Sequence, residues 1–210
     1  NKGEGAMIFI SSRTGGSWGS PQSITLFNDS SISVAHPAIS PDGSMLYFAS
    51  DAPGGYGGKD IWRAKLEGGK AEFVENAGSE INTPGDEMFP TFKPDGTLFY
   101  SSDGKPGIGG LDIFKAELKL KKDSTQGWEV TNMGIPLNSS ADDFGMTFAG
   151  DSEKGYFSSN RNETRGYDSL WSFVLPQLAY VLEGKLLARS GSPATCPLYP
   201  SDAAHDRLCG

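Results

Sequence analysis

Apolar and polar residues alternate along several segments of the chain, with the period of a strand rather than that of a helix. Phe114, Ala116 and Leu118 alternate with lysine and glutamate side chains, and the segment 62–66 shows the same pattern. Because successive side chains of a strand point to opposite faces of a sheet, the pattern predicts half-buried strands at both places.

Turn residues and aromatic residues complete a unit that occurs more than once. Pro-Asp-Gly at 41–43 and at 94–96 is a turn sequence, because proline fixes φ, aspartate caps its own backbone and glycine accepts a positive φ. An aromatic strand follows each turn, and then come a glycine-rich loop, the alternating strand and a last edge strand at 72–75 or 128–131. This order predicts four short antiparallel strands in a unit of about 53 residues.

Two further copies of the unit are incomplete. A degraded copy extends over 145–168, and a partial copy at 7–13 precedes the complete ones. Units of four antiparallel strands are typical of β-propeller blades, so we predict an all-β propeller fold with about three and a half blades. Because a ring needs at least four blades, we expect a fragment with blades missing before Asn1, and a compact four-bladed ring with a short first blade is the alternative. The expected divisions are a partial first blade at 1–36, blades at 37–89 and 90–144, a partial last blade at 145–178, and a linker or added tail at 189–210.

Composition excludes several other classes of protein. Glycine 28 and proline 13 among 210 residues would interrupt helices throughout, whereas 37% hydrophobic residues suffice to bury a core. The net charge of −8 disfavours binding to nucleic acids. The apolar runs are far shorter than a membrane span of roughly 20 residues. Cys196 and Cys209 both lie near the end of the sequence, where we expect neither to stabilise the core.

Aspartates recur at matching positions of the repeated unit. Catalytic sites are rarely built identically in every repeat, so we interpret these residues as structural groups that accept hydrogen bonds from turns and begin strands. Asn160 takes one of these positions in the degraded copy. The structural set is Asp42, Asp51, Asp60, Asp95, Asp103, Asp112 and Asp168.

Two pairs of adjacent carboxylates are candidate binding residues. Asp86 and Glu87 come just before the first strand of a unit, and Asp142 and Asp143 hold the matching place in the next unit. Carboxylates from neighbouring units could ring a channel mouth and bind Ca²⁺, which takes six to eight oxygen ligands. The first unit has no carboxylate there, so solvated loop caps are the alternative. We expect no cofactor, with Ca²⁺ as the one candidate.

Catalytic signatures are scarce. The chain has two histidines, His36 and His205, and it contains no Cys/His zinc cluster and no phosphate-binding loop motif. We therefore predict that the protein is not an enzyme. Tyr56 and Tyr167 lie in expected blade loops, where an aromatic ring can stack on a sugar or a peptide, and they are further candidate binding residues.

The residues at 40–62 resemble a known repeat. Ser-Pro-Asp-Gly, Phe-Ala-Ser-Asp and Gly-Gly-Lys-Asp-Ile-Trp occur there in the order of the WD-like propeller repeat of TolB-type proteins. Together with Ile-Asn-Thr-Pro-Gly-Asp-Glu at 81–87, the pattern looks most like the version in Bacteroidetes envelope proteins of the OmpA family, one of which belongs to the type IX secretion apparatus. The resemblance covers roughly residues 5–176. The stretch 180–186 resembles the first strand of a carboxypeptidase-regulatory-like module, which places that strand at 179–188.

This resemblance implies a function that the residues alone do not. It implies a non-enzymatic scaffold or protein-binding module, periplasmic and associated with the outer membrane, in a secretion or peptidoglycan-anchoring assembly. The expected partner is a protein of the cell envelope. The alternatives are a carbohydrate-binding propeller and a propeller that belongs to an enzyme, either a glycan-processing hydrolase or a prolyl-peptidase-like protein.

Overall fold

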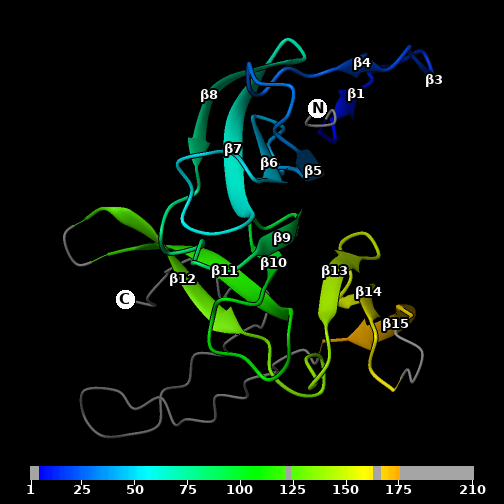
Figure 1. Ribbon diagram of the computed structural model, residues 1–210. Helices are drawn as coiled ribbons and strands as arrows, with labels where there is room; N and C mark the ends of the chain where they lie inside the picture. The colour runs from blue at the N-terminus through cyan, green and yellow to red at the C-terminus, as the bar shows by residue number, and fades with distance from the viewer. Residues whose placement is uncertain (1–4, 122–123, 163–166, 176–210) are drawn as a thin grey trace, which may run out of the picture. The chain divides into compact units, whose positions relative to one another are not determined.

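The computed structural model describes residues 5–121, 124–162 and 167–175, which form antiparallel sheets and loops without a helix (Figure 1). The all-β prediction is confirmed. Within the described ranges, no helix is long and apolar enough to cross a membrane. The chain divides into two units, Asn1–Pro176 and Gln177–Gly210, and all described residues belong to the first. Outside the described residues lie the expected strand at 179–188, the expected tail at 189–210, Cys196, Cys209 and His205.

Two four-stranded sheets and one three-stranded sheet follow one another along the chain (Figure 1). In each sheet, strands adjacent in sequence are hydrogen-bonded neighbours, so each sheet is an antiparallel meander. The first sheet consists of β5 (Val34–Ile39), β6 (Met45–Ser50), β7 (Asp60–Glu67) and β8 (Lys70–Asn76). The second consists of β9 (Glu87–Phe92), β10 (Leu98–Ser102), β11 (Asp112–Leu120) and β12 (Gln126–Asn132). The third consists of β13 (Asp143–Phe148), β14 (Lys154–Ser159) and β15 (Ser169–Val174).

Short strands precede the first sheet, in the region of the expected partial unit. They form two small antiparallel pairs, β1 with β4 and β2 with β3. Their bounds are β1 (Phe9–Ile10), β2 (Arg13–Thr14), β3 (Ser17–Trp18) and β4 (Gln22–Ser23).

The first strand of each sheet contains a β-bulge. At the bulges, His36, Phe89 and Gly145 have positive φ values of 51°, 56° and 65°. The sequence predicts that the units start at 37, 90 and 145, where the copies become similar in sequence. These positions fall at the bulges. In the first two copies the boundary comes directly after the bulge residue, whereas in the third it comes directly before Gly145. The sheets themselves begin two or three residues earlier, at the starts of β5, β9 and β13.

Apolar side chains on both faces of the first two sheets are buried between successive parts of the chain. The alternation along β6 and β7 places one set of side chains against the N-terminal segment and the other set against the second sheet. Trp62 and Phe114, which belong to the two segments of alternating apolar and polar residues, are both buried. The three clusters include Ile8, Ile24, Phe48 and Trp62; Tyr47, Ile61, Tyr100 and Phe114; and Phe99, Ile113, Met146 and Phe157.

One face of the third sheet is exposed. The strand pairing shows that Leu170 of β15 is equivalent to Ile113 of β11. Ser102 pairs with the residue before Ile113, and Ser159 pairs with the residue before Leu170. The side chain of Leu170 is 73% exposed, whereas that of Ile113 is 0% exposed. Tyr156 and Val174 are also exposed. This face therefore has the apolar character of an interface, and none of the described residues covers it as the third sheet covers the second.

Candidate functional site

The loop before each of β9 and β13 is hydrogen-bonded to the loop before a strand of the preceding sheet. The N–H of Glu87 donates to the carbonyl of Lys59 at 2.6 Å, and the N–H of Gly58 donates to the carbonyl of Gly85 at 3.0 Å. We call this arrangement, between residues 57–60 and 82–87, the first inter-sheet contact. The candidate carboxylates all lie in this contact or in its copy.

The second inter-sheet contact, between residues 109–112 and 138–143, repeats the first. The N–H of Asp143 donates to the carbonyl of Leu111 at 2.6 Å, and that of Gly110 donates to the carbonyl of Ala141 at 3.2 Å. Both contacts therefore join successive sheets through backbone hydrogen bonds, in the same geometry.

The Gly-Gly sequence of the glycine-rich loop is explained by this close approach. A Cβ added to Gly57 would lie 2.2 Å from the carbonyl oxygen of Gly85, and one added to Gly109 would lie 2.1 Å from that of Ala141. Real side chains do not approach backbone atoms so closely. The repeated glycines are thus required by contact with the next sheet.

The outer carboxylate of each pair bridges two loops. Oδ1 of Asp86 accepts the N–H of Lys59 at 2.8 Å, and Oδ2 of Asp86 lies 3.1 Å from Nζ of Lys59. Oδ1 of Asp142 accepts the N–H of Leu111 at 2.9 Å, and its Oδ2 accepts Nδ2 of Asn160 at 3.0 Å. These contacts occupy both oxygens of each outer carboxylate.

The inner carboxylate of the first pair, Glu87, is fully buried. It accepts the N–H of Thr83 at 2.8 Å, the hydroxyl of Thr83 at 2.5 Å and the hydroxyl of Ser102 at 2.6 Å. Burial raises the pKa of Glu87 above its ordinary value, because desolvation disfavours the charged form, although the hydrogen bonds oppose this effect.

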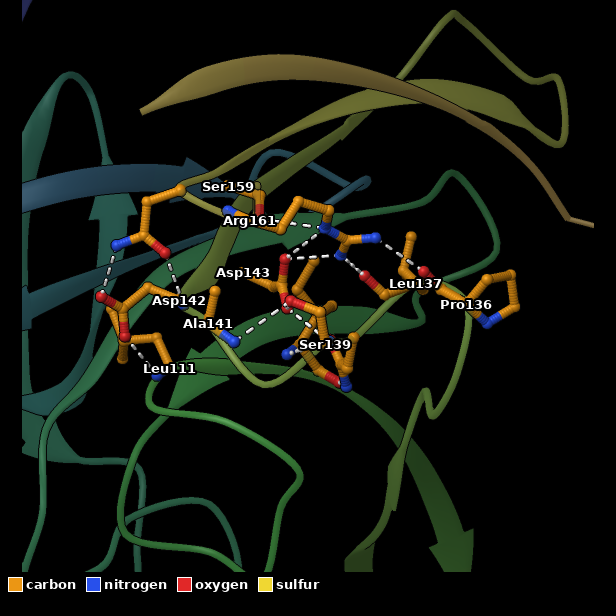
Figure 2. A network of polar contacts seen from close by, with 12 residues as sticks. Leu111, Pro136, Leu137, Ser139, Ala141, Asp142, Asp143, Ser159 and Arg161 are labelled. Carbon is orange, nitrogen blue, oxygen red and sulfur yellow. Dashed lines mark hydrogen bonds and ion pairs between the residues drawn. The ribbon is translucent and has the colours of Figure 1, made fainter. Parts of the chain in front are cut away.

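The inner carboxylate of the second pair, Asp143, is also fully buried, and it has a cationic partner (Figure 2). Nη2 of Arg161 lies 2.5 Å from Oδ1 of Asp143, and Nε donates to the same oxygen at 3.2 Å. Arg161 also donates to the carbonyls of Pro136 and Leu137, and the Ser139 N–H and hydroxyl donate to the other Asp143 oxygen at 2.6 and 2.8 Å. This network holds the loop before β13 to the end of β14.

Arg161 is a residue that the sequence analysis missed. Its guanidinium carbon lies 4.9 Å from the ring centroid of Phe157 and 5.3 Å from that of Trp171. Arg161 is in the degraded copy, so comparison with the complete copies gives no signal for it. One sequence signal could have identified it: the arginine comes two residues after the Ser-Ser end of a strand, in the copy that follows a carboxylate pair.

Two buried asparagines, also missed, join the same loops to β7 and β11. Asn82 accepts the N–H of Ile61 at 2.8 Å and donates to the carbonyl of the same residue at 2.8 Å. Asn138 makes the same two bonds with Ile113, at 2.9 and 3.0 Å. Each asparagine follows another asparagine by six residues, Asn76 and Asn132, and this repeated spacing was available in the sequence.

Asp60 and Asp112 begin β7 and β11, and each accepts a hydrogen bond from the preceding loop. Oδ2 of Asp60 accepts the N–H of Tyr56 at 2.9 Å, and Oδ2 of Asp112 accepts that of Ile108 at 2.5 Å. Burial raises the pKa of Asp60, and the charge of Asp86 adds to this increase.

Asp168 does not share the position of these two aspartates. The strand pairing sets Ser50 opposite Asp60 and Ser102 opposite Asp112, but it sets Ser159 opposite Ser169. The equivalent residue is therefore Ser169. The loop that precedes this position is equally long in the three copies, but the degraded copy has a single glycine where the complete copies have Gly-Gly, so a count from its last glycine gives the wrong residue.

The remaining structural aspartates cap turns and loops. Asp42 accepts hydrogen bonds from Ser40 and Ser44, which lower the pKa of Asp42 to about 2. The other bonds are from Thr97 N–H to Asp95 at 2.9 Å, from Ser33 N–H to Asp51 at 2.8 Å, from Asp86 N–H to Asp103 at 2.7 Å and from Asp142 N–H to Asn160 at 2.8 Å.

The candidate aromatic residues lie in loops, and His36 lies at a bulge. Tyr56 precedes β7 and is 50% exposed, and Tyr167 precedes β15 and is 68% exposed. The ring of His36 stacks on that of Phe89 with centroids 3.8 Å apart, and Phe89 lies 4.9 Å from Phe144. Burial, and then the charge of Lys59, lower the pKa of His36.

This chemistry favours a structural role for the paired carboxylates. Each carboxylate is hydrogen-bonded to donors of the chain, and in the described residues no group of three or more His, Cys, Asp or Glu side chains is placed to hold a metal ion. Calcium binding stays a prediction, and a thermal-shift titration with millimolar Ca²⁺ tests it: an unchanged melting temperature would contradict it.

Comparison with known proteins identifies no family. No protein-family model matches the chain, and no match was found among curated proteins. Among solved structures, the chain is similar to a mutant puromycin hydrolase in complex with PGG, with a TM-score of 0.35 and 13% sequence identity. The match covers 67% of this chain and 27% of the hydrolase chain, so this chain spans about a quarter of the length of that protein. A likeness this weak carries no conclusion about activity.

Proposed function

We propose that the three sheets are successive blades of a β-propeller and that the protein is a non-enzymatic, protein-binding scaffold. The two inter-sheet contacts carry the proposal, because each repeats the same backbone bonds, close glycines and carboxylate pair. A geometry repeated from sheet to sheet is what a ring of equivalent blades requires.

The exposed face of the third sheet supports a further blade beyond it. Leu170 and Tyr156 match residues of the second sheet that are buried against the third, Ile113 and Phe99. A large apolar face of this kind is stable when another layer covers it. A neighbouring blade of the same repeat would supply that layer.

The use of the carboxylates supports a scaffold rather than an enzyme. Asp86 and Asp142 are bound to backbone N–H groups of the preceding sheet, and the two inner carboxylates are fully buried. A general acid or nucleophile must reach its substrate, and these buried groups instead accept hydrogen bonds from serine, threonine and arginine side chains.

The cell-envelope location is part of the proposal and rests on the resemblance of residues 40–62 to envelope propeller repeats. The proposed partner is a protein of the envelope, bound through the blade loops that carry Tyr56 and Tyr167. Their exposed rings are suited to contacts with a partner, since loops on a rigid scaffold commonly carry binding residues.

Affinity capture from separate envelope and cytoplasmic extracts tests this function. The chain and a Phe73→Ala variant, which loses an exposed ring of β8, are expected to retain the same envelope protein. The Tyr56→Ala/Tyr167→Ala variant is expected to lose it. Equal capture by all three proteins would contradict binding through these loops. Glycan-array binding lost in Tyr56→Ala would favour carbohydrate recognition, and turnover of peptide or glycan substrates would contradict the non-enzymatic role.

A further inference from the structure

An open groove lies between the first and second sheets, at the end where the Pro-Asp-Gly turns lie. Its volume is about 380 Å³. Aromatic side chains of Tyr47, Phe92 and Trp128 line it, together with the turn residues Asp42 and Asp95. The rings of Tyr47 and Phe92 meet edge to face, with centroids 4.9 Å apart. The groove thus combines aromatic faces with two carboxylates.

The matching position between the second and third sheets is filled by the chain itself. Nζ of Lys93 lies 5.2 Å from the ring centroid of Phe148 and 2.5 Å from a carboxylate oxygen of Glu153. Only 13% of the Lys93 side chain is exposed. An ammonium group over an aromatic face and beside a carboxylate is a favourable arrangement that gains from desolvation.

Backbone pairing shows that the two places are equivalent. Phe92 pairs with the first residue of β10, and Phe148 pairs with the residue after the first of β14, at the same end of their sheets. The ring of Phe92 lies 4.9 Å from that of Tyr47, and the ring of Phe148 lies 5.0 Å from that of Phe99, measured between centroids. Tyr47 and Phe99 belong to equivalent strands, β6 and β10. Phe92 in the open groove therefore corresponds to Phe148 under the lysine.

The first sheet has a serine where the second has the lysine. The N–H groups of Ser40 and Lys93 each close a Pro-Asp-Gly turn, by donating to the carbonyls of Met45 and Thr97. The hydroxyl of Ser40 donates to Asp42 at 2.5 Å, and its short side chain leaves the groove open. The open groove thus keeps the aromatic face and the carboxylates but lacks the cation.

The charges around the groove leave it anionic. Hydrogen bonds lower the pKa of Asp42 to about 2, and despite burial, hydrogen bonds from Thr97 and the charge of Lys93 lower the pKa of Asp95. Two cations beside the groove are already paired. Lys93, whose charge acts on Asp95, contacts Glu153, and Arg63, which is hydrogen-bonded to Tyr47, lies 2.7 Å from Glu75. Both turn carboxylates are therefore ionised at neutral pH.

We propose that this groove binds the side chain of a lysine presented by a partner protein. The alkyl stem lies along Tyr47 and Trp128, and the ammonium group lies over Phe92 beside Asp95, as Lys93 lies over Phe148 beside Glu153. The inference deepens the protein-binding function proposed above, since it names the chemical group that the partner presents.

A small lysine probe tests the groove independently of any partner. The probe is Nα-acetyl-lysine methylamide, titrated while the indole N–H signal of Trp128 is followed by NMR. We expect saturable shifts at millimolar probe, and binding weaker by about fivefold in Asp95→Asn, as for the loss of one charge contact. The probe acetylated at Nζ is the control, and shifts of equal size with that control would overturn the proposal.

Substitution of Ser40 gives a second and sharper test. Ser40→Lys places a tethered ammonium group where Lys93 has its own, and it should reduce probe binding by about tenfold or more, because the tethered group has a high effective concentration. Ser40→Gln loses the same hydroxyl hydrogen bonds but adds no charge, and it should bind the probe like the wild type. Equal binding by Ser40→Lys and Ser40→Gln would overturn the proposal.

Thermal unfolding and partner capture complete the experiment. Ser40→Lys should melt at a higher temperature than Ser40→Gln if the groove receives the ammonium group, and a lower melting temperature would count against it. In the envelope-capture experiment, Ser40→Lys should lose the partner that Ser40→Gln retains. If Ser40→Lys no longer binds the probe but still captures the partner, the partner does not use the groove. That result would overturn the lysine groove and leave the protein-binding function standing.

Discussion

Glu87 and Asp86 are adjacent carboxylates with different environments. Asp86 is partly exposed and pairs with Lys59, whereas Glu87 is fully buried among hydroxyl and N–H donors. Successive residues at the start of a strand point in opposite directions, so one side chain reaches the neighbouring loop and the other enters the protein. A carboxylate pair in the sequence thus serves two separate purposes.

The buried carboxylate of Glu87 should make stability depend on pH. Its pKa is raised on folding, so its contribution to stability is present below the unfolded pKa and is lost as the pH rises through the raised value. Gln at this position keeps a carbonyl for the Thr83 N–H but carries no charge. The stability of Glu87→Gln relative to wild type is expected to increase from about pH 4 to 7. Urea unfolding at several pH values measures it, and a constant difference would contradict the prediction.

The ion pair of Arg161 with Asp143 should be costly to break from the arginine side. Arg161→Met leaves a fully buried carboxylate without its cation, which is expected to cost about 3–5 kcal/mol of unfolding free energy. Asp143→Asn in the same background should recover part of that loss. Urea unfolding of the two single variants and the double variant measures the coupling, and additive losses would show that the pair is not coupled.

At the scale of the element, the glycine-rich loop and the strand after it form the connection to the next sheet. The Gly-Gly sequence allows the loop to approach the next sheet, and the aspartate that begins the strand holds the loop through a backbone N–H. This dual use explains why both features recur together in the two complete copies. Repetition in the sequence indicated that the aspartate is structural, but it did not show that the loop before it contacts the next sheet.

Alanine in place of Gly109 should push the glycine-rich loop before β11 away from the loop before β13. Its Cβ would overlap backbone atoms of Ala141 and Ser139, so we expect Gly109→Ala to lower the unfolding free energy by about 1–3 kcal/mol. Gly19→Ala is the matched control, because its Cβ would lie 3.4 Å from the nearest atom, and it should change stability by less than about 0.5 kcal/mol. Chemical denaturation compares the two, and equal effects would argue against steric overlap.

At the scale of the whole described region, each sheet is stabilised by its neighbours. The first and second sheets bury one face against the preceding part of the chain and the other against the following sheet. Stability in such arrays is approximately a sum of the units and their interfaces, so the exposed face of the third sheet should contribute little.

Matched truncations on the second and third sheets test this description. Ile113→Ala removes buried side-chain atoms and should cost about 2–5 kcal/mol. Leu170→Ala changes an equivalent but exposed position and should cost less than about 1 kcal/mol. Thermal and urea unfolding measure both. A large loss in Leu170→Ala would show that this face is covered in solution.

Much of the strand order was predictable because it depends on local chemistry. The turns at 41–43 and 94–96, the alternation along β7 and β11, and the burial of Trp62 all follow from short-range patterns. Arg161 and the equivalence of Ser169 to Asp60 were missed because the third copy has diverged at both places. Pattern comparison fails where the copies differ, even though the strand pairing persists.

The sequence by itself determined the all-β class, the length of the repeated unit and the strands in it, because period, turn residues and composition act within a few residues of one another. Only the tertiary structure decided what the repeated residues do. It placed Gly57 and Gly109 against the next sheet, buried Glu87 and Asp143, and left the groove beside Ser40 open where Lys93 fills its counterpart. These properties depend on which atoms of a neighbouring sheet lie within a few ångströms, and that distance is set by packing rather than by sequence spacing.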